Sequence, residues 1–145
     1  MTPVSTSVLV EAPAAAVWVE LSDLASHVEW MTDAEAIDFE TATTSGEGVR
    51  MRVHTRIGPL STVDVIEVTE WDPVRRIGVS HRGLVSGYGS FDLAALAGGT
   101  RITWSETLKF PWWLGGPVIA SMARPILAAV WRRNLAALKR RIEGD

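Results

Sequence analysis

The sequence predicts an α+β domain in which one long amphipathic helix packs on one face of an antiparallel sheet. Several segments alternate apolar and polar residues, as half-buried strands do. The clearest is residues 49–57, where Val49, Met51 and Val53 share one face. A single long segment, residues 117–143, instead repeats apolar residues at spacings of three and four, which is typical of an amphipathic helix.

The expected elements run in the order strand, two short helices, six strands and long helix. The first strand covers residues 4–11, and Pro13 suits the first turn of a helix that runs through residue 21. A second short helix is expected over residues 24–29. The remaining strands are expected over residues 36–41, 49–57, 61–71, 76–82, 85–96 and 100–110.

Glycine and proline pairs separate the later strands and predict successive hairpins. Gly98 and Gly99 suit a tight two-residue turn, because glycine accepts a positive φ. With that turn, Phe91 lies opposite Glu106. The strands therefore form an antiparallel meander whose registers can be counted from the turns.

Composition limits the classes of function. The 145 residues are enough for one domain spanning 1–145, and the absence of cysteine excludes disulfides and thiolate sites. The three histidines are widely spaced, so we expect neither a metal nor another cofactor. The net charge is −3, and the sequence has no interleaving of aromatic and basic residues, which argues against nucleic-acid binding. Residues 1–49 hold nine acidic residues and no Lys or Arg, and we interpret this segment and the basic C-terminal end as solvated faces of one fold. Without a signal-peptide pattern or an uninterrupted apolar span, we expect a cytoplasmic protein with no integral membrane segment.

Four motifs resemble the START-like, or SRPBCC, superfamily, which contains polyketide cyclases, plant allergens of the birch-pollen (Bet v 1-like) type and lipid-transfer domains. They are VLVEAPAAAVWVELSDLASHVEWM, EVTEWDPVRRI, GGTRITWSETLKFP and NLAALKRRIE. The resemblance implies the helix-grip fold, a curved seven-stranded sheet around the C-terminal helix with two short helices after the first strand. It also implies an apolar cavity that takes a small hydrophobic molecule.

Alternation assigns the side chains that face this cavity. Ile102, Trp104 and Glu106 fall on the buried face of the last strand, because the intervening residues are all polar. Gly89 leaves room on the neighbouring strand. The candidate ligand-binding residues are Met51, Val53, Thr55, His81, Gly89, Phe91, Trp104, Glu106, Trp112, Trp113, Arg124, Leu127 and Trp131.

Glu106 and His81 are the candidate acid and base. A carboxylate on an apolar face must be paired, hydrated or held neutral, since burying it alone is costly. His81 either contacts a ligand or bonds locally to backbone or water. With Phe91 opposite Glu106, the two side chains lie about 10 Å apart across the sheet and about 13 Å along it. We therefore expect no direct hydrogen bond between them.

Two further predictions concern the junction between the last strand and the long helix. Trp112 and Trp113 lie in KFPWWLGGP and either form part of a lid over the cavity or pack against the helix start. A contact with a second copy of the chain or a membrane surface is a third reading. Arg124 falls on the backward extension of the apolar stripe, but Pro125 kinks or restarts the helix there, so Arg124 faces either the cavity or solvent.

Three functions fit the sequence. The first is a carrier or sensor for a lipid, isoprenoid or polyketide-like compound. The second is an enzyme of the polyketide cyclase/dehydratase type in which Glu106 or His81 acts as acid or base. The third is a protein-interaction or toxin-like module, in which the cavity is incidental. A homodimer is compatible with all three.

Overall fold

The computed structural model describes residues 3–144 and contains seven strands and four helices. The strands are β1 (Val4–Val10), β2 (Ala34–Phe39), β3 (Arg50–Ile57), β4 (Leu60–Asp72), β5 (Arg76–Arg82), β6 (Ser86–Leu96) and β7 (Gly99–Lys109). The α-helices are α1 (Ala14–Leu21) and α2 (Gly116–Glu143), and the 3₁₀ helices are η1 (Leu24–Glu29) and η2 (Trp112–Leu114). The expected element order is confirmed.

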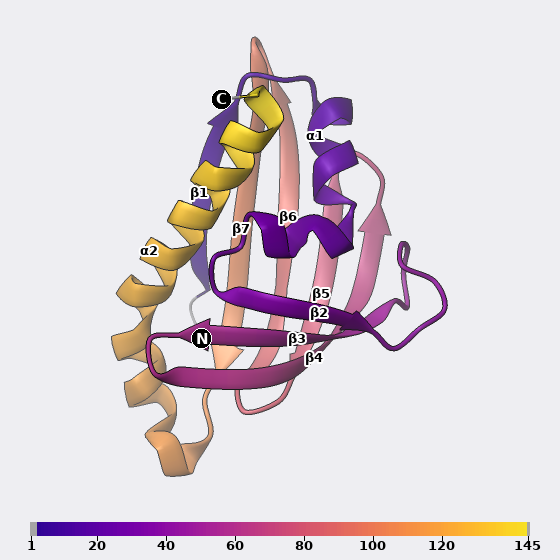
Figure 1. Cartoon of the computed structure of the whole chain (residues 1–145). Helices are drawn as coiled ribbons and strands as arrows, with labels where there is room; N and C mark the ends of the chain where they lie inside the picture. Colours follow the sequence, from indigo (N-terminus) through magenta and orange to yellow (C-terminus); the bar gives the residue numbers. More distant parts are fainter. Residues whose placement is uncertain (1–2, 145) are drawn as a thin grey trace.

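The strands form one antiparallel sheet in the order β1-β7-β6-β5-β4-β3-β2. Every strand after β1 pairs with the next one along the chain, as in a meander, and β7 closes against β1. The sheet curves so strongly that β2, β3 and β4 cross in front of the strands behind them (Figure 1). This half-barrel around a long C-terminal helix is the helix-grip fold.

Helix α2 lies against β1 and β7 (Figure 1), and the two ends of the helix are held differently. Its buried residues are Gly116, at the start, and Trp131, Asn134, Leu135 and Leu138 in the second half. The helix passes through Pro125 as one element, although proline removes a helical hydrogen bond there. The helix therefore does not restart at this proline.

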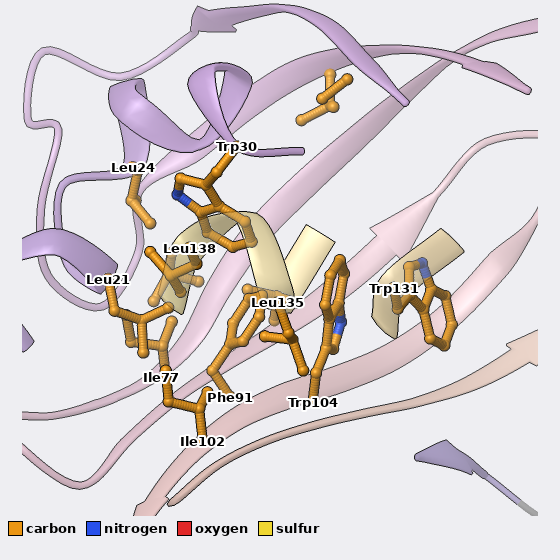
Figure 2. Close-up of a cluster of buried hydrophobic side chains, with 14 of the residues drawn as sticks. Leu21, Leu24, Trp30, Ile77, Phe91, Ile102, Trp104, Trp131, Leu135 and Leu138 are labelled. Atoms are coloured by element: carbon orange, nitrogen blue, oxygen red, sulfur yellow. The ribbon is translucent and has the colours of Figure 1, made fainter. Parts of the chain in front are cut away.

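The core fills the end of the half-barrel nearest α1. Leu21, Leu24 and Trp30 from the helical segment meet Leu135 and Leu138 of α2 over the inner face of the sheet (Figure 2). The opposite end lacks this filling.

In the described part of the chain, no helix is both long and apolar enough to cross a membrane.

Candidate functional site

A cavity of about 280 Å³ lies between the concave face of the sheet and α2. Apolar side chains from β2 to β7 and from α2 form most of its wall. The polar or charged residues that line it are His27, Asp33, Thr55, Thr62, Asp64, His81 and Glu106. The cavity is therefore mostly apolar with a few polar groups, as ligand-binding sites commonly are.

Strand β7 carries Glu106 into this cavity, where the residue is only 5 % exposed. Its partner on β6 is Gly89, and a Cβ atom there would lie 2.1 Å from Glu106 Oε2. The carboxylate thus lies directly over the glycine backbone. The absence of a side chain at Gly89 is what lets Glu106 reach across β6 toward β5.

Across β6, Glu106 meets His81 of β5. His81 Nε2 lies 2.7 Å from Glu106 Oε2, and Trp104 Nε1 donates to Glu106 Oε1 at 3.1 Å. Burial disfavours the charged imidazole, but the charge of Glu106, the hydrogen bond to it and the charge of Asp64 together raise the pKa of His81. The buried carboxylate is therefore satisfied by two donors rather than left alone.

This pair corrects the expectation that His81 and Glu106 are too far apart to bond. The turn between β6 and β7 is Ala97–Gly98, with Leu96 paired to Gly99, so Trp104 rather than Glu106 lies opposite Phe91. The shift moves Glu106 two residues closer to His81 along the sheet, or about 7 Å. Gly89 then allows the remaining distance to be bridged.

Asp64 is a third ionisable group in this region that the sequence analysis did not identify. Its Oδ1 is buried without a hydrogen-bond partner, and its Oδ2 has only a long contact of 3.5 Å with Thr62 Oγ1. Burial raises the pKa of Asp64, against the lowering influence of the His81 charge. The alternation of the strand could have identified Asp64, since it shares the inner face of β4 with Ile66 and Val68.

His27, also not identified from the sequence, lines the cavity from η1. Its Nε2 lies 2.7 Å from the carbonyl oxygen of Leu21, to which it donates as a neutral imidazole. Burial lowers the pKa of His27 from 6.5 to about 4, although the hydrogen bond to Leu21 raises it. His27 is therefore a neutral group in the wall at ordinary pH.

A row of aromatic side chains starts at His27 and forms a wall through the middle of the molecule. The ring centroids of His27 and Trp30 lie 4.8 Å apart, those of Phe91 and Trp104 also 4.8 Å apart, and Trp131 stacks on Trp104 at 5.1 Å. Figure 2 shows Trp30, Phe91, Trp104 and Trp131 along this path. Large aromatic faces at this wall offer a flat apolar surface to a ligand.

The structure brings most of the predicted ligand-binding residues to the cavity. The lining includes Met51, Val53, Thr55, His81, Phe91, Trp104, Glu106, Leu127 and Trp131.

Gly89, Trp112, Trp113 and Arg124 do not line the cavity. Gly89 lies beneath the Glu106 carboxylate. Trp112 is 86 % and Trp113 62 % exposed, so neither packs as a lid or against the helix start in this conformation. Arg124 Nη2 donates to the carbonyl oxygen of Pro3 at 3.4 Å, which directs it toward the start of β1.

A comparison with known protein families identifies the family of this chain. The model of the family described as "Polyketide cyclase / dehydrase and lipid transport" matches residues 1–143. The chain belongs to this family. Among curated proteins, no significant sequence match is found.

Solved structures agree with this family on the fold. A protein from Thermus thermophilus superposes with a TM-score of 0.78 at 17 % identity, over 99 % of this chain and 98 % of its own. A START superfamily protein from Mycobacterium smegmatis gives 0.75 at 18 %, over 98 % and 97 %. The Zhui aromatase/cyclase from a Streptomyces species gives 0.72 at 22 %, over 98 % and 93 %. At these identities the likeness establishes the fold alone.

The cavity presents a small set of polar groups that a ligand could contact. A protonated His81 has two N–H groups, of which one is directed to Glu106 and the other can donate to a ligand. Asp64 Oδ1 is an acceptor without a partner. Within residues 3–144, no group of three or more His, Cys, Asp or Glu side chains is arranged to hold a metal ion.

Proposed function

We propose that the protein binds a small apolar molecule with one or two oxygen substituents in this cavity, as a carrier or sensor. The observation that carries the proposal is the hydrogen-bonded pair of His81 and Glu106 inside an otherwise apolar cavity of about 280 Å³. Enclosing about 300 Å² of apolar ligand surface contributes about 7 kcal/mol before ordering costs. The family description, which includes lipid transport, supports the same conclusion.

The cavity size narrows the ligand class. A volume of 280 Å³ is at the small end of ligand cavities, which commonly span about 300–1,000 Å³. It suits a fused-ring compound or a short isoprenoid or acyl chain, and it is too small for a whole two-chain lipid. A keto or phenolic oxygen would accept from His81, while a hydroxyl would donate to Asp64.

A polyketide cyclase/dehydratase-type enzyme is the second candidate. The observation in its favour is that His81 and Glu106, at 2.7 Å, form a buried proton donor and acceptor pair at the cavity wall. General acid–base catalysis needs such a group within hydrogen-bond reach of the substrate. The family description names cyclases and dehydrases, and one structural neighbour is an aromatase/cyclase.

Native mass spectrometry with organic extraction of the purified protein tests for a bound molecule. Affinity is then measured by displacement of a fluorescent fatty acid from the wild type and from Glu106→Gln. Glu47→Gln, on the exposed turn before β3, is the matched control. A carrier should lose affinity at least about tenfold in Glu106→Gln, because a neutral amide no longer favours the protonated form of His81. The ligand oxygen then loses a hydrogen bond from a charged group, which is worth about 1.5–3 kcal/mol.

The two candidates differ in what the variants change. An enzyme should lose turnover of a polyketide-like substrate in both Glu106→Gln and His81→Ala, with affinity changed much less. Equal turnover in both variants and the wild type would remove the enzyme candidate. If nothing is extracted and no apolar probe binds the wild type, the carrier proposal is wrong.

A further inference from the structure

Asp64 lines the cavity with a carboxylate whose hydrogen-bonding capacity is almost unused. Its Oδ1 is buried without a partner, and its Oδ2 has only the contact of 3.5 Å with Thr62 Oγ1. An ionised carboxylate has about four acceptor sites, and buried polar groups in proteins are nearly always hydrogen-bonded. The Asp64 carboxylate can therefore accept a hydrogen bond from a molecule in the cavity.

Two glycines make room for carboxylates on either side of His81. A Cβ atom at Gly83, which follows β5, would lie 2.1 Å from Asp64 Oδ1. The same distance would separate a Cβ atom at Gly89 from Glu106 Oε2. Both carboxylates thus lie directly over glycine, and both approach the end of β5 that carries His81.

Asp64 and His81 are neighbours across the paired strands β4 and β5. The residue opposite His81 is Ile66, so Asp64, two residues along the same face of β4, is the diagonal neighbour of His81. Diagonal neighbours lie about 7–8 Å apart, which leaves room for one ligand oxygen between two side chains. His81 Nε2 is directed to Glu106 at 2.7 Å, so the second N–H of a protonated imidazole can donate to that oxygen.

The charged groups around the cavity are mostly negative. Among the described residues, the lining contains the carboxylates of Asp33, Asp64 and Glu106 but no Lys or Arg. Protonated His81 is the one positive charge of this lining, because burial lowers the pKa of His27 to about 4 and keeps it neutral. An anionic group enclosed here would add to an excess of negative charge, which is unfavourable in a poorly hydrated site.

We propose that Asp64 makes the cavity selective for an apolar ligand with a neutral hydroxyl group, which accepts from His81 and donates to Asp64. A hydroxyl combines both functions on one oxygen. A ketone or an ether accepts from His81 but leaves Asp64 unpaired, a carboxylate is repelled by Asp64, and an ammonium group has nothing that can accept from His81. This selectivity rests on the proposed binding function and names the group by which the ligand is chosen.

The ionisation of Asp64 gives a readout that a purely structural role would not change. Burial raises the pKa of Asp64, against the lowering effects of the His81 charge and the Thr62 hydroxyl. A ligand hydroxyl that donates to the carboxylate favours its charged form, so it should lower this pKa. An ether with the same ring system should leave the pKa raised. NMR titration of the Asp64 carboxyl carbon with each ligand measures the difference.

Four probes with the same fused rings test the selectivity: naphthol, methoxynaphthalene, naphthoate and naphthylmethylamine, each substituted at the same ring position. At neutral pH naphthol is uncharged, whereas naphthoate is ionised. By calorimetry, naphthol should bind the wild type at least about tenfold more tightly than each of the others, equivalent to about 1.4 kcal/mol. A long fatty acid can leave its carboxylate in water at the cavity mouth, where Leu60 and Ile126 are exposed, so enclosed ring compounds give the sharper comparison.

Two substitutions separate the charge of Asp64 from its hydrogen bond. Asp64→Asn should weaken the discrimination against naphthoate, because the negative charge is lost. In Asp64→Ala, naphthol and methoxynaphthalene should bind with similar affinity. Asp72→Asn and Asp72→Ala are the matched controls, since Asp72 is an exposed residue of the same strand that does not line the cavity. The controls should keep the selectivity of the wild type, and circular dichroism should show the same fold in all variants.

The comparison in the wild type needs no variant. The proposal is overturned if methoxynaphthalene, naphthoate or naphthylmethylamine binds the wild type as tightly as naphthol does, or if Asp64→Ala keeps the preference for naphthol. Equal affinity for all four probes would leave the proposed binding function standing while removing the role of Asp64. Binding of none of them would contradict both proposals.

Discussion

Replacing Gly89 with alanine should separate His81 from Glu106 without changing either residue. A Cβ atom at position 89 would lie 2.1 Å from Glu106 Oε2, 2.3 Å from Cδ and 2.7 Å from Oε1. These distances are too short for any packed arrangement, so the carboxylate must move. The φ of Gly89 lies outside the left-handed region, so the backbone itself accepts alanine.

The expected cost follows from what the carboxylate loses. Glu106 would give up its contacts with His81 at 2.7 Å and Trp104 at 3.1 Å. Breaking a buried ion pair costs about 3–5 kcal/mol, and we expect about 3 kcal/mol because the displaced carboxylate can turn into the cavity. In a Glu106→Ala background the clash is absent, so Gly89→Ala should change stability by no more than about 0.5–1 kcal/mol.

Urea unfolding of the wild type, both single variants and the double variant measures this coupling. NMR titration of His81 is the second readout, because its raised pKa depends on Glu106 and should fall in Gly89→Ala. The contribution of a raised histidine pKa is fully present below 6.5 and is lost as the pH rises through the raised value. The cost of Gly89→Ala should therefore shrink at alkaline pH. Equal costs of Gly89→Ala in the two backgrounds would refute the reasoning.

Three further predictions concern other buried residues. Because the pKa of His27 is lowered from 6.5 to about 4, the unfolded chain takes up this proton first as the pH falls. Stability should drop by about 3 kcal/mol over that range, and acid titration of His27→Gln should lack this loss. Asn134 Oδ1 accepts hydrogen bonds from Thr32 N and Thr32 Oγ1, at 3.0 Å each. Replacing Asn134 with alanine should lower the free energy of unfolding by about 2–3 kcal/mol, measured by urea denaturation. A loss below about 0.5 kcal/mol would contradict this prediction. Trp131→Phe should cost about 1–2 kcal/mol and widen the cavity, so displacement assays should favour longer fluorescent fatty acids than in the wild type.

Alternation and helical spacing were sufficient to predict the architecture. They identified all seven strands and the long helix, and they put Trp104 and Glu106 on the inner face. These properties depend on burial, which repeats along a single element and can be read from neighbouring residues. The resemblance to START-like proteins then supplied the curvature of the sheet.

The register of the last hairpin could not be obtained in this way. Both Gly98 and Gly99 suit a turn, but only Gly98 has the positive φ, at 87°. Gly99 begins β7, and a Cβ atom there would lie 2.4 Å from the carbonyl oxygen of Val10. This glycine is explained by the close approach of β1, a long-range contact that no local pattern reveals. The His81–Glu106 contact depends on that register, and so it was missed.

The two halves of α2 are buried to different extents, and this difference affects how a ligand could enter or leave the cavity. No side chain from residues 117 to 130 is fully buried, whereas Trp131, Leu135 and Leu138 are held in the core. Amide hydrogens in the first half of the helix should therefore exchange with solvent faster than those in the second half. The first half of α2 can then open locally while the second half and the rest of the fold remain folded.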